Sequence, residues 1–315
     1  KAYFGIRFKS SIKNMEKDQS LVATQHKAVL IDEVIAALQP SENKIFLDVT
    51  CGGGTHTQAL LNADPMVKVI ALDWDPKAIK RLEPLVEHYQ GRLTLIWASF
   101  AHLYKISKKH HFPQFDGILA DFGTSQDQIY TNDGFSFTID TPLDMRMSSS
   151  HFKTTAFDIV NYATSEELRH ILWTYGEEQR AKDIVAMIIE SRKKQKIKTT
   201  HELARCVIQA IGWNPAKKTH PATRTFQALR IFVNKELDNI SAFLPSAFDL
   251  LKTNGRLACI SFHSLEDRLV KDFYKTIEKK GKGNNVSSRA ITPQDQEIAN
   301  NQSSRSSKLR ILEKK

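Results

Sequence analysis

The stretch KIFLDVTCGGGTHT, residues 44–57, constrains the fold more than any other part of the chain, because three consecutive glycines directly follow a short apolar run. A short, continuously apolar run predicts a strand covered on both faces, which is typical of a parallel sheet in an α/β protein. Glycines at the carboxyl end of such a strand allow a ligand to approach the backbone where the next helix begins. The stretch therefore predicts a nucleotide-like ligand at the end of the first strand.

The same short apolar pattern recurs along the chain and predicts further strands. The runs are residues 67–73, 92–99, 115–122 and 255–262, with a last candidate at 308–315. About a hundred residues separate the fourth run from the fifth, and helical periodicity dominates them in residues 156–176, 181–194, 199–212 and 223–252. Because the fifth strand arrives so late, we expect a helical insertion. The polar segment 279–307 is expected to be a mobile loop.

The order of residues in the glycine turn narrows the class of ligand. The spacing Asp48-x-Thr50-x-Gly52-x-Gly54 resembles the D-x-[GT]-x-G-x-G turn of doubly wound S-adenosylmethionine-dependent methyltransferases. The dinucleotide fingerprint G-x-G-x-x-G requires a glycine at the position of Thr57, and no Gly-Lys-[Ser/Thr] follows to form a phosphate-binding P-loop. A dinucleotide-dependent oxidoreductase is thus the weaker alternative.

Candidate ligand residues also follow the next three predicted strands. Asp73 ends the second, where a carboxylate accepts hydrogen bonds from both hydroxyls of a ribose. Asp75 is its rival, but a proline follows it and predicts a helix cap instead. Phe100 and Asp121 end the third and fourth strands, positions that flank the adenine and the transferred methyl group in this fold.

Composition bounds the partners and the cofactors. Lys and Arg number 45 against 35 Asp and Glu, a surplus that favours a polyanion such as RNA, although it is also compatible with a protein that merely stays soluble. Cys51, Cys206 and Cys259 lack CxxC spacing, and His110 and His111 have no cysteine or carboxylate beside them, so we expect neither a disulfide framework nor a metal site. No apolar run approaches the roughly 18 residues of a membrane span.

Several longer strings resemble the MraW/RsmH family of small-subunit rRNA cytosine-N4 methyltransferases. They are HKAVLIDEV (26–34), DQIYTNDGFSFTIDTPLDMRM (127–147), YGEE (175–178), HPATRTFQALRIFVNKEL (220–237), GRLACISFHSLEDRLVK (255–271) and SRSSKLR (304–310). The resemblance implies a doubly wound class I methyltransferase domain formed by residues 26–130 and 218–315. It also implies an inserted helical subdomain, residues 131–217, that recognises RNA.

The motif and the resemblance together define the expected cofactor site for S-adenosylmethionine. Its residues are Asp48, Gly52, Gly54, Thr55, His56, Asp73, Phe100, Asp121 and Gln128. Two positions depart from the bacterial pattern, because Thr55 replaces a glycine and Gln126 stands where the family has a serine. These departures keep open a non-catalytic ribosome assembly factor that retains the fold.

Methyl transfer to an exocyclic amine requires acceptors for the amine hydrogens. Asp121 is one candidate, and Ser261 and His263, which follow the fifth strand, are further catalytic candidates within reach of a target base. His263 is equally compatible with a structural or helix-capping role. The expected contacts to substrate RNA are Phe135, Phe137, Asp144, Arg146, Arg224 and Arg230. For both phenylalanines, packing in a core is the alternative.

The first residues bear on location and partners. Residues 1–14 carry four basic residues, two phenylalanines and no acid, which resembles the end of an organellar transit peptide. The alternative is a basic arm on a cytoplasmic protein. We therefore expect an unstructured basic arm at 1–25, the mitochondrial methyltransferase-like branch of the family, and a mitochondrial matrix location. The expected partner is small-subunit rRNA within an assembling subunit, with possible assembly factors, no membrane, and a monomer or homodimer.

Overall fold

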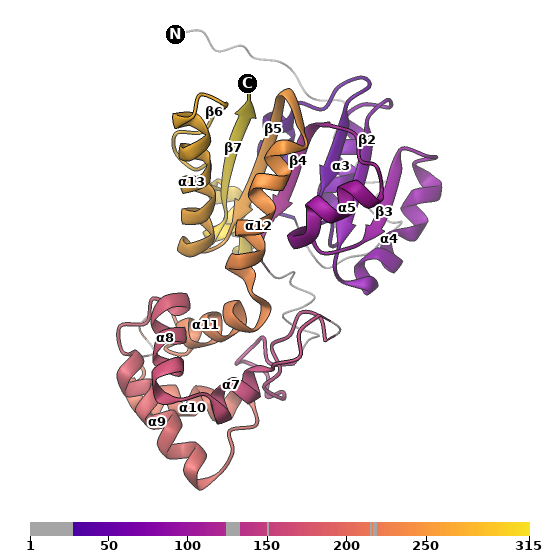
Figure 1. Ribbon diagram of the computed structural model, residues 1–315. Helices are drawn as coiled ribbons and strands as arrows, with labels where there is room; N and C mark the ends of the chain where they lie inside the picture. Colours follow the sequence, from indigo (N-terminus) through magenta and orange to yellow (C-terminus); the bar gives the residue numbers. More distant parts are fainter. Residues whose placement is uncertain (1–27, 124–132, 150, 215, 217–218) are drawn as a thin grey trace.

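The computed structural model consists of a sheet body and a helical body, drawn in the upper and lower parts of Figure 1. It describes residues 28–123, 133–149, 151–214, 216 and 219–315. The predicted basic arm therefore lies outside the described residues. Within the described part of the chain, no helix is both long enough and apolar enough to cross a bilayer.

The sheet body is built on one seven-stranded sheet with the order β3-β2-β1-β4-β5-β7-β6. The strands are β1 (Ile45–Asp48), β2 (Lys68–Asp73), β3 (Leu93–Trp97), β4 (Phe115–Asp121), β5 (Leu251–Ser261), β6 (Gly283–Asn285) and β7 (Lys308–Lys314). Neighbours from β3 to β5 pair in parallel, whereas β7 is antiparallel to both β5 and β6. This is the class I methyltransferase fold, as predicted.

Helices cover both faces of the sheet, which explains why its central strands β1, β2 and β4 are mostly apolar. One face packs against α2 (Ile31–Leu38), α3 (Thr55–Ala63) and α4 (Pro76–His88). The other packs against α5 (Leu103–Lys109), α12 (Glu236–Asp249) and α13 (Ser264–Lys279). Successive residues of β1 alternate between these layers: Phe46 joins the first core and Leu47 the second.

A separate core forms the helical body. Its helices are α7 (Ala156–Tyr162), α8 (Ser165–Gly176), α9 (Ala181–Lys194), α10 (Thr200–Ile211) and α11 (Thr223–Asn234). The helical core includes Phe226, Leu229 and Val233 of α11, so the body extends beyond the boundary that the sequence placed at residue 217. The predicted long helix 223–252 instead breaks at Lys235, whose φ of 50° lies in the left-handed region.

The expectation of a mobile loop at 279–307 was wrong. The segment contains β6, the helix α14 (Asp295–Asn300) and the 3₁₀ helix η2 (Gln302–Ser306). Glu297 accepts a hydrogen bond of 2.9 Å from the backbone N–H of Leu30, and Ile291 forms a β-bridge with Leu309. The segment is polar because it lies on the surface, but it is held by contacts with residues far away in the sequence.

A surface contact joins the two bodies. Glu177 follows α8 with a φ of 48°, and its carboxylate accepts hydrogen bonds of 2.8 Å from Ser264 Oγ and Arg268 Nη2. Both donors belong to the first turns of α13. The family-like YGEE string therefore tethers the helical body to the start of this helix.

A buried amide forms a second connection at the end of α11. Asn234 has no exposed surface. Its Oδ1 accepts from the backbone N–H of Met147, and its Nδ2 donates to the carbonyl of Met145, both at 2.7 Å. Asn234 thus holds the segment that enters the helical body against the helix that leaves it.

We expect Asn234→Ala to lower the free energy of unfolding by about 2–4 kcal/mol, because a buried N–H and a buried carbonyl lose their partner. Urea denaturation followed by circular dichroism measures the change. The control is Asn300→Ala on the exposed face of α14, expected to stay within about 0.5 kcal/mol of the parent. Equal stability of the two variants would contradict this role for Asn234.

Candidate functional site

Backbone conformation and close packing both explain why glycines occupy the turn after β1. Gly52 has a φ of 47° and donates its N–H to Asp73 Oδ2 at 2.8 Å. Gly54 has a φ of 80°, and a Cβ added there would lie 2.7 Å from Leu82 Cδ2 of α4. A side chain at Gly54 would therefore be strained and would push α4 away, so this glycine is required by the fold as well as by a ligand.

Asp48 lies beneath the turn. It is 1% exposed and accepts hydrogen bonds from Thr57 Oγ1 at 2.7 Å and from the backbone N–H of Thr50 at 3.1 Å. Burial raises the pKa of Asp48 to about 6, although these two hydrogen bonds oppose the shift. Asp48 therefore ties the turn to α3, and its contact with the cofactor stays a prediction.

Asp73 ends β2 at the edge where the turn begins. Its carboxylate accepts from the backbone N–H groups of Gly52 at 2.8 Å and Asp75 at 2.9 Å. A carboxylate has about four acceptor sites, so each oxygen retains capacity for a ribose hydroxyl. Asp75 accepts from the backbone N–H of Lys77 at 2.9 Å and caps α4, as predicted from the proline that follows it.

The cofactor affinity is expected to fall as the pH drops through 6. Burial raises the pKa of Asp73 to about 6, so its carboxyl becomes protonated below that pH and loses acceptor capacity. The dissociation constant for S-adenosylmethionine should rise by up to about tenfold per pH unit below 6, measured by calorimetry from pH 5 to 8. Asp73→Asn should bind weakly throughout with a smaller pH dependence. A flat parent profile would refute the assignment.

The raised pKa of Asp73 also makes the stability of the folded protein depend on pH. The folded-state pKa of Asp73 lies above its ordinary value of 3.8, so between these pH values the folded protein binds more protons than the unfolded chain. The contribution of Asp73 to stability is therefore greatest below pH 3.8 and is lost as the pH rises through 6.

Asp121 and His56 face each other at the ends of β4 and the glycine turn. The His56 Nε2 lies 2.9 Å from the carbonyl of Val29, and its Nδ1 lies 3.8 Å from Asp121 Oδ2. Burial lowers the pKa of His56, so the ring is neutral and donates from Nε2 to Val29. Thr50 Oγ1 accepts from the backbone N–H of Asp121 at 2.7 Å and holds the strand end in place.

One oxygen of Asp121 is left for a ligand. Its Oδ1 is buried and has no hydrogen-bond partner among the described residues. Burial first, and then the charges of Asp48 and Glu266, raise the pKa of Asp121 well above its usual range. An orphaned buried carboxyl oxygen is uncommon and marks a site for an incoming donor or cation.

An aromatic wall adjoins these carboxyl groups. Phe100 lies within 5.8 Å of Phe122 and 5.5 Å of Phe243, measured between ring centroids. Phe100 and Phe122 line a cavity of about 30 Å³ together with Trp74. Phe122 and Phe243 are buried, and Phe100 packs against them at the end of β3, where the sequence places the adenine. Thr55 is the half-buried first residue of α3, whereas Gln126 and Gln128 lie outside the described residues.

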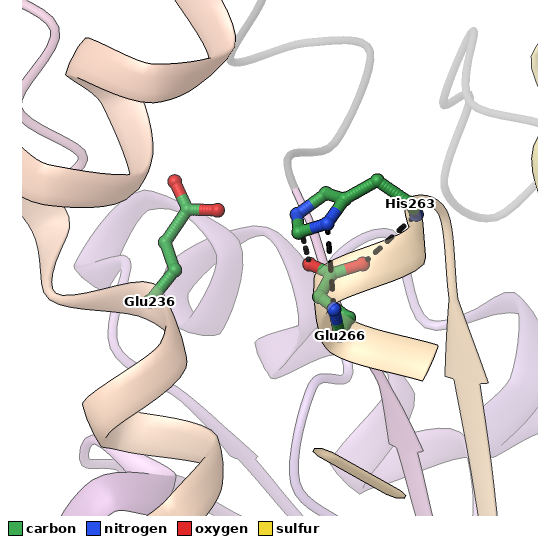
Figure 2. A group of neighbouring side chains, drawn as sticks. All are labelled: Glu236, His263 and Glu266. Carbon is green, nitrogen blue, oxygen red and sulfur yellow. Dashed lines mark hydrogen bonds and ion pairs between the residues drawn. The ribbon is translucent and has the colours of Figure 1, made fainter. Parts of the chain in front are cut away.

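The start of α13 holds His263 in a network of acidic groups, drawn in Figure 2. His263 caps this helix: its Nδ1 accepts from the backbone N–H of Glu266 at 3.4 Å, and its Nε2 lies 3.3 Å from Glu266 Oε1. The other oxygen of Glu266 accepts from the backbone N–H of Phe262 at 2.8 Å. The capping alternative for His263 therefore holds, and its effect on the site acts through Glu266.

Glu236 completes this group from α12. Ligand atoms of Glu236, His263 and Glu266 lie within 4.8 Å of one another, close enough to consider a metal ion. However, Glu236 already accepts two hydrogen bonds of 2.9 Å from the guanidinium of Arg230, which supplies the neutralising charge. His263 Nε2 is buried and has no hydrogen-bond partner among the described residues, but the charge of Glu236 is already matched by Arg230, and we assign no metal to this group.

Ser261 is 1% exposed within β5, and its hydroxyl donates to the carbonyl of Lys308 on β7 at 3.4 Å. This contact favours a structural role, and the catalytic role of Ser261 stays a prediction. Position along a strand does not reveal which neighbour a side chain faces.

The predicted RNA-binding aromatics are partly used inside the helical body. Phe137 stacks on His220 with ring centroids 4.5 Å apart and meets Phe226 at 5.3 Å. Core packing, the alternative stated for both phenylalanines, therefore describes Phe137. Phe135 is half-buried.

Most of the predicted RNA-binding charges are also paired within the chain. Arg146 forms two hydrogen bonds of 2.7 Å with Asp144, and Arg230 is paired with Glu236. Arg224 is exposed, and its Nη1 donates to the carbonyl of Glu177 at 3.2 Å. Of these arginines, Arg224 best matches a phosphate-binding role. The sequence did not single out His151, Phe152 and Lys153, which line a groove beside the helical body, because no local motif marks them.

Comparison with known proteins identifies close relatives along almost the whole chain. The model of the MraW methylase family matches residues 23–315. The Ribosomal RNA small subunit methyltransferase H of Coprothermobacter proteolyticus is 43% identical over 92% of this chain and 96% of its own length. The protein of the same name from Sulfurihydrogenibium sp. is 43% identical over 91% and 98%, respectively. That of Rickettsia conorii is 38% identical over 90% and 96%.

Proposed function

Because the chain belongs to the MraW methylase family, we propose that it transfers the methyl group of S-adenosylmethionine to the N4 amine of a cytidine in small-subunit rRNA. Its family makes the chain a methyltransferase of small-subunit rRNA, and the N4 amine of a cytidine is the acceptor that we propose. The observation that carries it is the buried Oδ1 of Asp121 at the end of β4, which has no hydrogen-bond partner in the described part of the chain.

The chemistry of an exocyclic amine explains why such an oxygen is needed. The nitrogen lone pair is delocalised into the base, so the amine becomes nucleophilic only as it pyramidalises. Asp121 accepts a hydrogen bond from an amine N–H and orients the lone pair, and its raised pKa favours uptake of the proton that the nitrogen releases once it is methylated. The bound cofactor supplies an electrophilic methyl group. Asp73 and the glycine turn would hold its ribose and methionine parts, and Phe100 would contact its adenine.

The cysteines support an amine over a ring carbon as the acceptor. Methylation at carbon 5 of a pyrimidine requires prior attack by a nucleophile, typically a reactive thiolate. The chain has three cysteines, and Cys51, Cys206 and Cys259 are all buried. Burial raises the pKa of each thiol, which makes all three poor nucleophiles.

The test is methyl transfer from isotopically labelled S-adenosylmethionine to small-subunit rRNA, presented naked and in partly assembled subunits. Nucleoside mass spectrometry identifies the product. Labelled N4-methylcytidine supports the proposal. Label on another nucleoside would show that the acceptor is not the N4 amine of cytidine. If folded, cofactor-bound protein transfers no label to any substrate, the result favours a non-catalytic assembly factor. This alternative remains because Thr55 and Gln126 depart from the bacterial pattern.

The mitochondrial matrix is the proposed location. The acid-free, basic composition of residues 1–14 supports it, whereas the bacterial relatives favour the cytoplasmic alternative. Fusing residues 1–25 to a fluorescent reporter in eukaryotic cells tests import directly. The proposed partner is rRNA in an assembling subunit, with assembly factors as further candidates, and light scattering would distinguish a monomer from a homodimer.

A further inference from the structure

A groove of about 390 Å³ opens beside the junction of the two bodies. We call it the hinge groove, and its chemically distinctive lining residues are His151, Phe152, Lys153, Tyr175, Lys235 and Asp238. They come from the segment before α7, from α8, and from the break between α11 and α12. The volume falls in the range of about 300–1,000 Å³ that small-ligand sites occupy.

The hinge groove lies next to the cofactor edge of the sheet. The ring of Phe152 meets that of Trp74 edge to face, with centroids 5.9 Å apart, and Trp74 directly follows Asp73. The ring of His151 lies 6.4 Å from that of Trp97 at the end of β3. A ligand in the groove is therefore separated from the cofactor edge by one layer of aromatic side chains.

The lining combines aromatic surface with positive charge. Phe152 and Tyr175 are half-buried, and Lys153 and Lys235 are exposed. Among the described residues that line the groove, Asp238 is the single acidic one. Aromatic rings beside cationic side chains are the combination that holds unpaired nucleotides, because bases stack on the rings and phosphates pair with the charges.

We propose that the hinge groove holds an unpaired nucleotide of the substrate rRNA, next in the strand to the target base. Its base packs against Phe152 and Tyr175, and its phosphates pair with Lys153 and Lys235. The proposal rests on the proposed function and deepens it, since it assigns the path of the RNA to residues other than the paired Asp144, Arg146 and Arg230. A protein segment in the groove is the competing occupant, which the test below separates.

The test uses charge reversal in the full chain: Lys153→Glu, Lys235→Glu and the double variant, with Lys275→Glu as the control. Lys275 is an exposed lysine on α13 of the sheet body. Binding of a fluorescent single-stranded oligocytidylate is measured by anisotropy at several salt concentrations. The salt slope of binding should fall by about 0.7 for each phosphate that is no longer neutralised, hence about 1.4 in the double variant. The control should keep the parent slope.

A second variant separates stacking from charge. Phe152→Ala should weaken oligocytidylate binding by about 5- to 150-fold, whereas Phe152→Tyr, which keeps the ring face, should bind like the parent. Thermal denaturation and cofactor binding check that each variant is folded. If the double variant does not fold, the single Lys153→Glu, in an exposed segment before α7, carries the test.

The outcomes distinguish this inference from the function on which it rests. A parent that methylates rRNA, with lysine variants unchanged in salt slope and in KM for rRNA, overturns the hinge groove alone and leaves a protein segment as its occupant. A parent that binds RNA through the groove but transfers no methyl group overturns the proposed function alone. Raised KM and reduced salt slope, with unchanged cofactor affinity, support both.

Discussion

Replacing Asp121 with alanine should reduce single-turnover methyl transfer by about 10²- to 10⁴-fold, the range expected for loss of a group that handles a reacting proton. The reason is the Oδ1 of Asp121, which is buried at the end of β4, has no hydrogen-bond partner within the ranges that the structure describes, and is the acceptor that an exocyclic amine needs. Rapid quench with labelled cofactor and small-subunit rRNA measures the effect at saturating concentrations of both.

The matched control lies on the same strand. Asp116→Ala removes a carboxylate near the start of β4 that pairs with Lys252 at 2.8 Å and also accepts from the backbone N–H of Ile45 at 2.9 Å, so the folding of this variant is checked by thermal denaturation. Transfer should remain near the parent value. Asp121→Asn tests the chemistry further, because the amide keeps one acceptor oxygen but not the charge, and we expect an intermediate rate. Full transfer by Asp121→Ala, with normal cofactor affinity, would exclude the assigned role.

Arg230→Ala should produce the largest loss of stability, about 3–5 kcal/mol, because it leaves a buried carboxylate without its countercharge. Glu236 is 7% exposed and receives two hydrogen bonds of 2.9 Å from Arg230. Arg230 lies near the end of α11 and Glu236 begins α12, so the pair also sets the angle at which the helical body leaves the sheet body. Guanidinium denaturation measures the change in free energy of unfolding.

An exposed pair of the same chemistry provides the control. Arg180 and Asp183 are 56% and 47% exposed, and Arg180→Ala should cost no more than about 1 kcal/mol. The double variant Arg230→Met with Glu236→Leu should recover much of the loss, because no buried charge then remains unpaired. If Arg230→Ala were as mild as Arg180→Ala, the network around Glu236 would not be the structural joint described here.

Local patterns predicted the elements that depend on near neighbours in the sequence. The five parallel strands, the glycine turn and the Asp75 cap each follow from residues a few positions apart, where periodicity and capping chemistry act directly. Asp73 and Asp121 were also placed at one edge of the sheet, since in a doubly wound sheet the carboxyl ends of parallel strands share that edge. The split at Lys235 was missed because both flanking segments are strongly helical.

Long-range partners decided the rest. Arg230 and Phe137 were predicted to contact RNA. In the structure Arg230 forms hydrogen bonds with Glu236, and Phe137 stacks on His220. Nothing in the local sequence of segment 279–307 reveals that Glu297 bonds to Leu30. Local spacing reveals only which residues are neighbours along the chain. A hydrogen bond depends on which residues are neighbours in space, and these can be far apart in sequence.

The sequence alone therefore determined the kind of sheet, the edge at which we expect the cofactor and the family to which the chain is similar. Only the tertiary structure decided which polar groups are already paired and which remain for a ligand. In the folded chain, Asp48, Ser261 and Arg230 form hydrogen bonds with other residues of the chain. Asp121 keeps one oxygen that has no partner among the described residues. The physical reason is that a buried polar group must find a partner, and the folded chain offers candidates that are distant in sequence.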